Sequence, residues 1–404
     1  MSICPTEYWL WLQCALGAGA KTDELLAYFG DPEKMYNAGS NEWRLSGLMT
    51  NKKIEALKSI SPSETGGIFR ECKAKGYSII TPDSVNYPER FKQLSDMPLV
   101  LYAMGDASVL KDTVSIGVVG TRDASNYGIE TAQKLSFSLA SCGVTIVSGG
   151  ALGIDSEAHA GAMLAKGRTA AFLGCGLSYD YLKENASLRR AITKYGAVVS
   201  EYAPFTPASR TTFPIRNRLI SGLTLGTLVI EAGVKSGSLI TANYALEQGK
   251  DVFAVPGDIV RSSFDGANHL IKNGAKPVFS AMDILSEYEY FYGDLIDFSK
   301  ADISLTEIPY VEYRKKTQKA VITEKSIVNE KPVEEKCNKG KKPALDDNFS
   351  DEAKKVYSVL NENPTHIDDI LRQTSLKMSE VLSALTELEL MGDVKQTEGK
   401  KYSI

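Results

Sequence analysis

The sequence has no CxxC pair, no apolar run long enough to cross a bilayer and no excess of basic residues. Its six cysteines are scattered, so neither a zinc site nor a disulfide framework is expected. The apolar start lacks the basic segment of a signal peptide, and we expect a cytoplasmic protein with no membrane partner. A net charge of -4 argues against a broadly basic nucleic-acid binder. A local stripe formed by Arg210, Arg216 and Arg218 remains compatible with that charge.

What the sequence does contain is a repeated pattern of glycine turns and arginines. Four segments carry it: residues 120–122, 148–155, 213–218 and 231–238. Glycines at strand ends let backbone N–H groups approach an anion, and a following helix N-terminus adds its dipole. Arginine matches phosphate oxygens in a fork geometry. The repetition indicates a row of phosphates, and therefore a nucleic-acid backbone rather than a single nucleotide.

The segment from about 77 to 282 alternates short apolar, β-branched runs with helical patterns. We expect strands at 114–119, 144–147, 169–173, 197–200, 228–230 and 252–255, and helices at 131–140, 156–165, 182–194 and 238–248. This alternation is typical of a Rossmann-like, doubly wound α/β fold with a mostly parallel sheet. Ligands of such folds bind beyond the carboxyl ends of the strands, where the glycine segments fall.

The pattern along the chain predicts four parts. Residues 1–75 resemble small SAM or helix-hairpin-helix modules, and residues 76–289 form the Rossmann-like DNA-binding core. Residues 290–347, rich in Lys and Glu toward their end, are expected to be a flexible linker. Residues 348–404 show three helical stretches and a short hairpin, which is the winged-helix plan. The third of these helices has an acidic and small face, so a protein contact is at least as plausible as groove reading.

Two apparent nucleotide motifs fail on spacing. Residues 17–22 look like a P-loop, but Ala20 and Ala15 stand where that motif needs glycine, so ATP is not expected there. The turn at 117–120 lacks the G-x-G-x-x-G spacing of dinucleotide sites, and no acidic ribose partner follows. We therefore expect no cofactor and no metal. His159 is predicted to be structural, and Glu231 to orient an arginine or to cap backbone N–H groups.

A long ordered set of residues in the middle block matches a known family. The matching positions are 120–122, 125, 127–128, 148–151, 153–155, 158–159, 174–176, 200–202, 213–214, 216–218, 231–232, 236–238, 241 and 254–257. With these residues the chain resembles the DNA-processing protein A family (DprA, also called Smf). The helical start and the winged-helix tail look like that family's flanking modules.

The resemblance implies an extended Rossmann fold that binds single-stranded DNA, forms a homodimer and loads the RecA recombinase. The biological setting would be competence, with homologous recombination during DNA-mediated natural transformation, and no catalytic activity is established for the family. The expected DNA-binding residues are Arg122, Ser148, Gly149, Gly150, Lys183, Asn185, Arg216, Asn217, Arg218, Ser236, Gly237, Ser238 and Thr241. One position departs from the family: Leu182 stands where Pro usually follows Tyr, which leaves the loop beside Lys183 less fixed.

An enzymatic alternative stays open at this point. Nucleotide phosphoribohydrolases share a related fold, and Glu231 with Arg216 and the 148–150 turn could hold a nucleoside monophosphate. The chain lacks the Pro-Gly-Gly-x-Gly-Thr sequence that those enzymes carry before their glutamate. We therefore expect a protein that is not an enzyme and has no catalytic residues.

Overall fold

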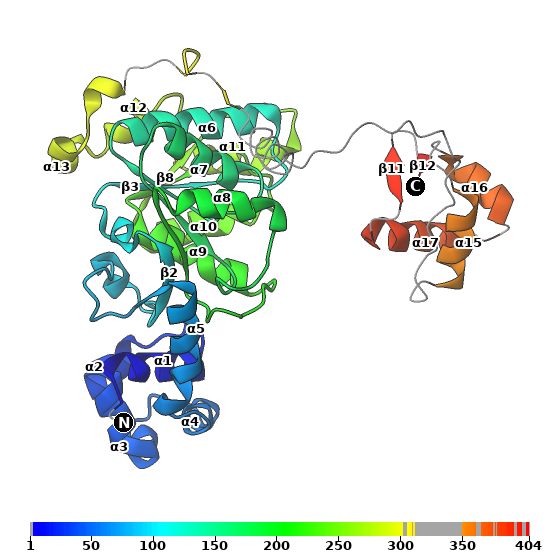
Figure 1. Cartoon of the computed structure of the whole chain (residues 1–404). Coiled ribbons are helices and arrows are strands. Elements are labelled where there is room, and N and C mark those ends of the chain that lie inside the picture. The colour runs from blue at the N-terminus through cyan, green and yellow to red at the C-terminus, as the bar shows by residue number, and fades with distance from the viewer. Residues whose placement is uncertain are drawn as a thin grey trace, which may run out of the picture. The chain divides into compact units, whose positions relative to one another are not determined.

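The structure is a computed structural model that describes residues 3–301, 305–308, 310–311, 350–360, 365–374, 376, 378–391, 394–397 and 401–403. The chain divides into two compact units, Met1–Ser326 and Ile327–Ile404 (Figure 1). Each unit has a hydrophobic core of its own. Among the described residues, no helix combines the length and apolar character needed to span a bilayer.

A nine-stranded sheet forms the centre of the first unit, in the order β1-β2-β6-β5-β4-β3-β7-β8-β9. Its strands are β1 Ser78–Ile80, β2 Leu101–Gly105, β3 Ser115–Val119, β4 Thr145–Ser148, β5 Thr169–Leu173, β6 Gly196–Ser200, β7 Gly226–Val229, β8 Asp251–Ala254 and β9 Lys276–Pro277. Strands β1 and β2 pair antiparallel with their neighbours. All other neighbours are parallel. The predicted doubly wound, mostly parallel sheet is therefore confirmed.

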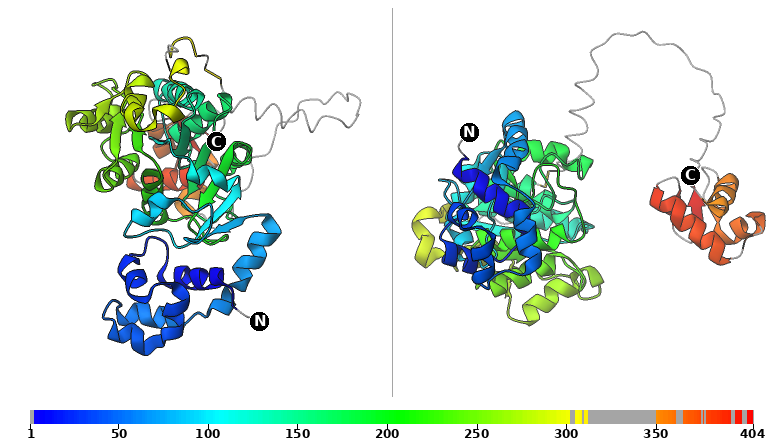
Figure 2. Two further views of the ribbon diagram at one scale, coloured as in Figure 1. Left: turned by 90° about the vertical axis from the view of Figure 1, so that its left-hand side faces the viewer. Right: turned by 90° about the horizontal axis from the view of Figure 1, so that it is seen from below.

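Helices cover both faces of the sheet (Figures 1 and 2). They are α6 Asn126–Ser141, α7 Ile154–Leu164, α8 Ala186–Ile192, α9 Thr212–Leu223, α10 Ser238–Glu247 and α11 Asp265–Lys272. Successive strand residues point to opposite faces. In β4, Ile146 packs in the core that includes α6 and α7, whereas Val147 packs in the core that includes α9 and α10. Burial on both faces explains why the strands read as continuous apolar runs.

The order of the strands places a topological switch point at β3. The chain runs outward from β3 through β4 and β5 to β6, and then returns through α9 to β7 on the other side of β3. Loops that leave neighbouring strands in opposite directions open a crevice at the carboxyl ends of the strands. The loops after β3 and β7 therefore flank the expected ligand site.

The N-terminal helices form one end of the first unit, next to β2 (Figures 1 and 2). They are α1 Pro5–Leu16, α2 Asp23–Phe29, α3 Pro32–Leu45, α4 Asn51–Lys58 and α5 Gly66–Lys75. Trp11 and Trp43 lie in their core together with Tyr102 of β2. The N-terminal core thus continues onto the edge of the sheet.

Residues after the last strand also pack on the core. The short helices α12 Met282–Leu285 and α13 Glu289–Tyr292 follow β9, and Ile296 and Ala301 are buried against the sheet. Gln133 of α6 then holds Val311, donating to its carbonyl at 2.9 Å and accepting from its N–H at 2.8 Å. The predicted linker thus begins with residues that contact the core, and its part from 312 to 347 lies outside the described residues.

The second unit has the predicted winged-helix plan. Its elements are α15 Asp351–Val359, β10 Thr365–His366, α16 Ile367–Thr374, α17 Met378–Met391, β11 Lys395–Thr397 and β12 Lys401–Ser403. The strands form a small antiparallel sheet in the order β10-β12-β11. Val356, Ile370 and Leu385, one from each helix, are buried together in its core. Ser350 caps α15 by accepting from the N–H of Ala353.

Candidate nucleic-acid interface

A cavity of about 380 Å³ lies at the carboxyl ends of β3, β4 and β7, at the switch point. Its walls come from the loops after β3 and β4, from α9 and from the start of α10. The lining residues are Val119, Gly120, Thr121, Arg122, Asp123, Ala151, Asp155, Phe213, Pro214, Arg216, Asn217, Ile220, Ser236, Gly237, Ser238, Ile240 and Thr241. Of the residues predicted to contact DNA, the lining includes Arg122, Arg216, Asn217, Ser236, Gly237, Ser238 and Thr241.

The loop after β3 is fixed by hydrogen bonds to the buried side chain of Glu231. This carboxylate is fully buried and accepts hydrogen bonds from the N–H of Ser125 at 3.0 Å and from its hydroxyl at 2.7 Å. A Cβ at Gly128 would lie 2.1 Å from the same carboxylate, so only glycine fits there. The expectation that Glu231 caps backbone N–H groups is confirmed. Its role is to fix the loop that carries Arg122.

Arg122 is the exposed cation of the site. Its guanidinium carbon lies 5.0 Å from the centroid of the Phe213 ring, within the range of a cation–π contact. Phe213 in turn lies 5.3 Å from Tyr181, measured between ring centroids. Within the described part of the chain, no ion pair engages Arg122, so its N–H groups can face an anion in the cavity.

Arg216 forms the floor of the cavity and is buried. Its guanidinium donates to the carbonyls of Gly149, at 2.7 Å, and Phe172. A Cβ at Gly149 would lie 2.6 Å from both Arg216 and the carboxylate of Asp155, so this glycine makes room for these two side chains. Burial raises the pKa of Asp155, and the Arg216 charge opposes that rise.

Several glycine-turn residues shape the turn and do not face the cavity. Ser148 is buried, and its hydroxyl donates to the carbonyl of Val118 at 2.6 Å. Asn185 is buried as well, and its amide donates to the carbonyls of Gly150 and Ala151, both at 3.1 Å. The loop after β4 is thus fixed by hydrogen bonds within the protein. They engage the side chains of Ser148 and Asn185 and the carbonyls of Gly149 and Gly150.

Lys183 lies outside the cavity lining. Its side chain is exposed and pairs with Asp180 at 3.5 Å. The preceding Leu182 has φ of 50°, a conformation that proline cannot adopt because its ring fixes φ near −65°. A loop with Pro at this position, as the family usually has, must therefore differ from this one in its backbone conformation.

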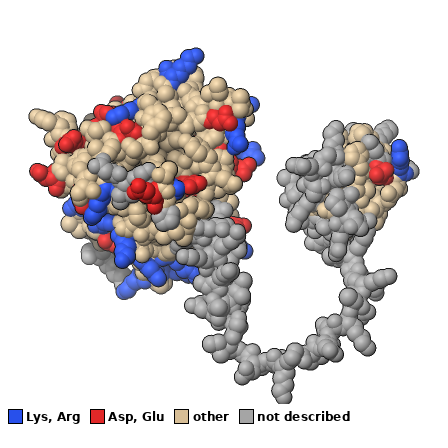
Figure 3. Space-filling model, turned by 90° about the horizontal axis from the view of Figure 1, so that it is seen from above, with Lys and Arg blue, Asp and Glu red and all other residues tan. Residues whose placement is uncertain are grey.

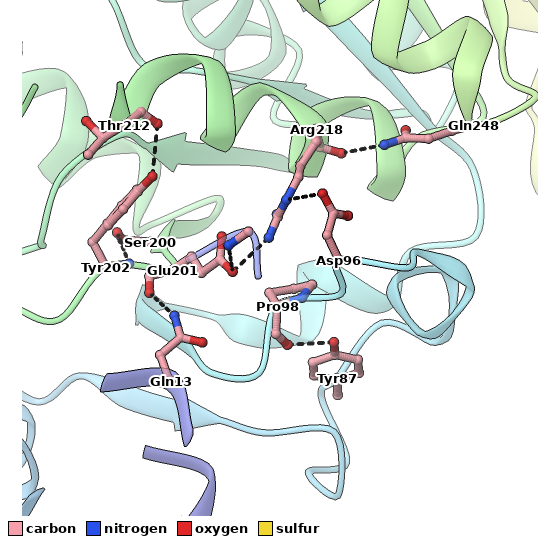
Figure 4. A network of polar contacts seen from close by, with 11 residues as sticks. Gln13, Tyr87, Asp96, Pro98, Ser200, Glu201, Tyr202, Thr212, Arg218 and Gln248 are labelled. Atoms are coloured by element: carbon pink, nitrogen blue, oxygen red, sulfur yellow. Dashed lines mark hydrogen bonds and ion pairs between the residues drawn. The ribbon is translucent and has the colours of Figure 1, made fainter. Parts of the chain in front are cut away.

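Arg218 lies away from the cavity, in a buried polar network (Figure 4). Its guanidinium pairs with Asp96 at 3.1 Å and with Glu201 at 2.8 Å, and only 2% of its side chain is exposed. A phosphate has no access to this side chain. The predicted stripe is therefore split: Arg216 reaches the cavity, Arg218 does not, and Arg210 is exposed.

The start of α10 closes the other side of the cavity. Gly237 occupies the cap position and its carbonyl accepts from the Asn217 amide at 3.3 Å. The hydroxyls of Ser236 and Ser238 are 2.7 Å apart. This arrangement places two hydroxyls and a helix N-terminus at the cavity, which suits an anion.

Charge alone does not mark the site. On the face shown in Figure 3, Lys and Arg lie mostly toward the margins, with Asp and Glu interspersed. Within the cavity lining, Arg122 and Arg216 are accompanied by Asp123 and Asp155. A bound phosphate would therefore depend on a few placed donors, not on a broad positive surface. The proximity of Asp155 to Arg216 was not predicted; the available signal was the position of Asp155 in the Gly153-Ile154-Asp155 turn.

His159 is buried in α7 and lies behind the site. Its Nδ1 donates to the hydroxyl of Thr169 at 2.7 Å, because that hydroxyl donates onward to the carbonyl of Ile146. Burial, with the charge of Arg216, lowers the pKa of His159 to about 3. The prediction of a structural histidine is consistent with this environment.

This environment predicts a specific pH dependence. Unfolded histidine takes up a proton near pH 6.5, whereas folded His159 stays neutral, so stability falls as the pH drops below about 6.5. Well below pH 6.5, this one proton makes the free energy of unfolding fall by about 1.4 kcal/mol per pH unit. Between about pH 6.5 and pH 5, we expect the free energy of unfolding of His159→Gln to fall by about 2 kcal/mol less than that of the parent protein. Urea unfolding measures this difference. The exposed His269→Gln serves as control, and equal pH slopes for parent and His159→Gln would refute the assignment.

A doubly wound sheet with its cavity at the switch point defines a Rossmann-like α/β protein, the class that binds ligands in this crevice. Residues 78–289 match the family model described as DNA recombination-mediator protein A, and residues 340–400 match the DprA winged helix domain. The chain belongs to the DNA recombination-mediator protein A family, as the resemblance in its sequence implied.

Individual relatives agree with this assignment. Protein Smf from Synechocystis is 32% identical over 359 residues, covering 88% of this chain and 86% of the relative. DNA processing protein DprA from Bacillus subtilis is 42% identical over 215 residues, covering 53% of this chain and 72% of the relative. The X-ray structure of DprA from Streptococcus pneumoniae superposes with a TM-score of 0.61 at 32% identity, covering 71% of this chain and 99% of that one.

Proposed function

We propose that this chain binds single-stranded DNA at the switch-point cavity and loads the RecA recombinase onto it during natural transformation. The observation that carries the proposal is the exposed Arg122 guanidinium, held over Phe213 at the mouth of a cavity floored by Arg216. The family description and the name DNA processing protein, which several relatives carry, support DNA as the ligand. In this proposal the protein is cytoplasmic and acts with RecA as a partner.

The site suits a strand with unpaired bases. Arg122 and the N-terminus of α10 can hold successive phosphates, and the aromatic rings of Phe213 and Tyr181 lie beside Arg122. Stacking on such rings needs bases that are free of a duplex, and it tolerates any sequence. We therefore propose that the protein prefers single strands over duplex DNA, with little dependence on sequence along most of the strand.

The proposal is a binding function without catalysis. The carboxylate that a phosphoribohydrolase would need, Glu231, is fully buried and engaged by Ser125. Dimerisation would place two cavities on one strand and raise the avidity. The loop between β8 and α11 exposes Ile259 and Val260, at 86% and 84%, which supports that side of the sheet as the dimer surface.

Fluorescence anisotropy of a labelled single strand, titrated at several salt concentrations, tests the proposal. We expect Arg122→Ala to weaken binding about 10-fold or more, because a hydrogen bond to a charged group is lost. The slope of log affinity against log salt should fall by about 0.7, the value for one phosphate contact on a single strand.

The control removes the same charge elsewhere. Arg70 is exposed on α5 in the N-terminal helices, so Arg70→Ala should keep the parent affinity and slope. Equal losses in the two variants would mean that only net charge matters. If the parent protein binds neither strand nor duplex, the cavity serves a small ligand, and release of free base from nucleotides becomes the assay to run.

A further inference from the structure

Gly174, the first residue after β5, lies beside the aromatic ring that supports Arg122. A Cβ added at Gly174 would lie 2.6 Å from Cδ1 and 3.1 Å from Cε1 of the Phe213 ring. The guanidinium carbon of Arg122 lies 5.0 Å from the centroid of that same ring. Resting on the proposed function, we infer that Gly174 is a positioning residue for DNA binding. Its missing side chain sets where the Phe213 ring lies, and therefore where Arg122 meets a phosphate.

The loop after β5, residues 174–182, restrains the Phe213 ring at two places. Gly174 is buried at the edge of the ring. Tyr181 lies 5.3 Å from it between ring centroids, with 45° between the ring planes. Protein interiors are packed so closely that one added methylene group is felt. A methyl group at Gly174 would therefore have to displace either the ring or the backbone on one side of the contact.

Hydrogen bonds fix the backbone on both sides of this contact, so the ring is the part that has to move. The Ser200 hydroxyl, at the end of β6, donates to the carbonyl of Cys175 at 2.7 Å and accepts from the N–H of Tyr202 at 3.0 Å. The Tyr202 hydroxyl then donates to the carbonyl of Thr212 at 3.1 Å (Figure 4). These two carbonyls belong to the chain neighbours of the glycine and of the phenylalanine. The end of β6 thus sets the spacing between the loop after β5 and the start of α9.

A second glycine fixes the same loop from its other side. A Cβ at Gly176 would lie 2.2 Å from the carbonyl oxygens of Ala203 and Pro204. The N–H of Gly176 donates to the carbonyl of Thr206 at 2.8 Å, and the N–H of Ser178 donates to that of Pro204 at 2.8 Å. The loop after β5 therefore lies directly against the loop after β6. It cannot move away from the ring without breaking these hydrogen bonds.

Gly174→Ala adds crowding without backbone strain. The φ of Gly174 is not in the positive range, so alanine can adopt its backbone conformation. The added methyl group displaces the Phe213 ring, and Arg122 keeps its charge but loses the surface that orders it. The guanidinium must then be ordered when it binds a phosphate. Ordering one such side chain lowers the affinity about 2- to 10-fold.

The test is a double-mutant cycle on the full-length protein, measured by anisotropy with a labelled single strand. We expect Gly174→Ala to weaken binding about 2- to 10-fold. The salt dependence should stay that of the parent protein, because the Arg122 charge still reaches the phosphate. In an Arg122→Ala background the glycine substitution should have no further effect, since Gly174 acts through that arginine. Equal losses in the two backgrounds would overturn the inference.

A second cycle covers a Gly174→Ala protein that does not fold. Phe213→Ala removes the ring atoms that the new methyl group would meet, so the double variant Gly174→Ala, Phe213→Ala should fold. It should bind the strand as tightly as Phe213→Ala alone, because the ring is the link between Gly174 and Arg122. A double variant that fails to fold, or that binds more weakly than Phe213→Ala, would contradict the positioning role.

The matched control is Gly222→Ala in α9. The φ of Gly222 is not in the positive range either, and an added Cβ would lie 2.9 Å from Cδ1 of Leu94, in the core. This variant is crowded like Gly174→Ala but has no contact with the Phe213 ring, so its affinity should equal that of the parent protein. Loss of affinity in the control as large as in Gly174→Ala would overturn the inference. Absence of binding by the parent protein would instead refute the proposed function itself.

Discussion

Replacing Arg218 by alanine is expected to lower the free energy of unfolding by about 3–5 kcal/mol. The side chain is 2% exposed and pairs with Glu201, whose side chain is also 2% exposed. Its second partner is Asp96, at 3.1 Å. Without the guanidinium, two carboxylates would remain near each other, one of them fully desolvated. The cost is therefore that of an uncompensated buried charge, which exceeds the value of a surface ion pair.

The substitution should also weaken the contact between the N-terminal helices and the sheet, because Glu201 takes part in that contact. Glu201 accepts from the N–H of Gly19 through its side chain and from the Gln13 amide through its carbonyl (Figure 4). Burial raises the pKa of Glu201, and Arg218 is the main group that opposes this rise. In the variant the carboxyl becomes easier to protonate, so its hold on Gly19 weakens.

Chemical denaturation of the parent protein and the variant measures the effect. Arg168→Ala is the matched control, because Arg168 pairs with Asp106 at 3.2 Å and Asp112 at 3.1 Å but is 43% exposed. We expect that control to lose about 0–1 kcal/mol. A similar small loss for Arg218→Ala would show that the buried network contributes no more than a surface pair.

The second large effect is expected for Gly153→Ala. Gly153 has φ of 73° and ψ of −129°, a region open in practice to glycine alone, where other residues are strained by about 1–3 kcal/mol. The added Cβ would also meet the carbonyl oxygens of Thr121 and Arg122 at 2.5 Å. These are backbone atoms that cannot rotate away, so crowding adds about 1–3 kcal/mol. The loop must move, and the affinity for single-stranded DNA should fall together with stability.

Gly76→Ala separates strain from crowding. Gly76 ends α5 with φ of 67°, and a Cβ added there would meet no neighbouring atom within 4 Å. We expect it to cost about 1–2 kcal/mol and to leave DNA binding unchanged. Denaturation and anisotropy on both variants give the comparison. Full DNA affinity in a folded Gly153→Ala protein would contradict the role assigned to this contact.

Periodicity predicted the core of the sheet well. The strand at 169–173 begins and ends where it was expected, because five apolar or β-branched residues are buried on both faces. The helix expected at 131–140 begins earlier, at Asn126, since Ser125 caps it by accepting from the N–H of Gly128. Strand β2 was not predicted, although residues 99–104 form a continuous apolar run; what that run does not reveal is the antiparallel pairing with β1 and with the distant β6.

The site was harder to predict than the fold. Arg216 and Arg218 are two residues apart in the sequence and were expected to lie in one stripe. In a helix such residues point about 200° apart. Hence Arg216 faces the cavity and Arg218 faces Glu201. Likewise, the helix expected at 182–194 begins only at Ala186 after a short 3₁₀ turn, because Leu182 has a left-handed backbone that no local pattern indicated.

The contact between Arg122 and Phe213 has an entropic consequence. A long side chain that becomes immobile on binding costs about 0.5–1.5 kcal/mol of ordering. Arg122 already lies over the Phe213 ring in this structure, with its guanidinium 5.0 Å from the ring centroid. When Arg122 binds an anion, much of this entropy cost has therefore already been met in the free protein. The aromatic ring thus contributes to affinity by restricting the arginine before binding, in addition to any base that stacks on it.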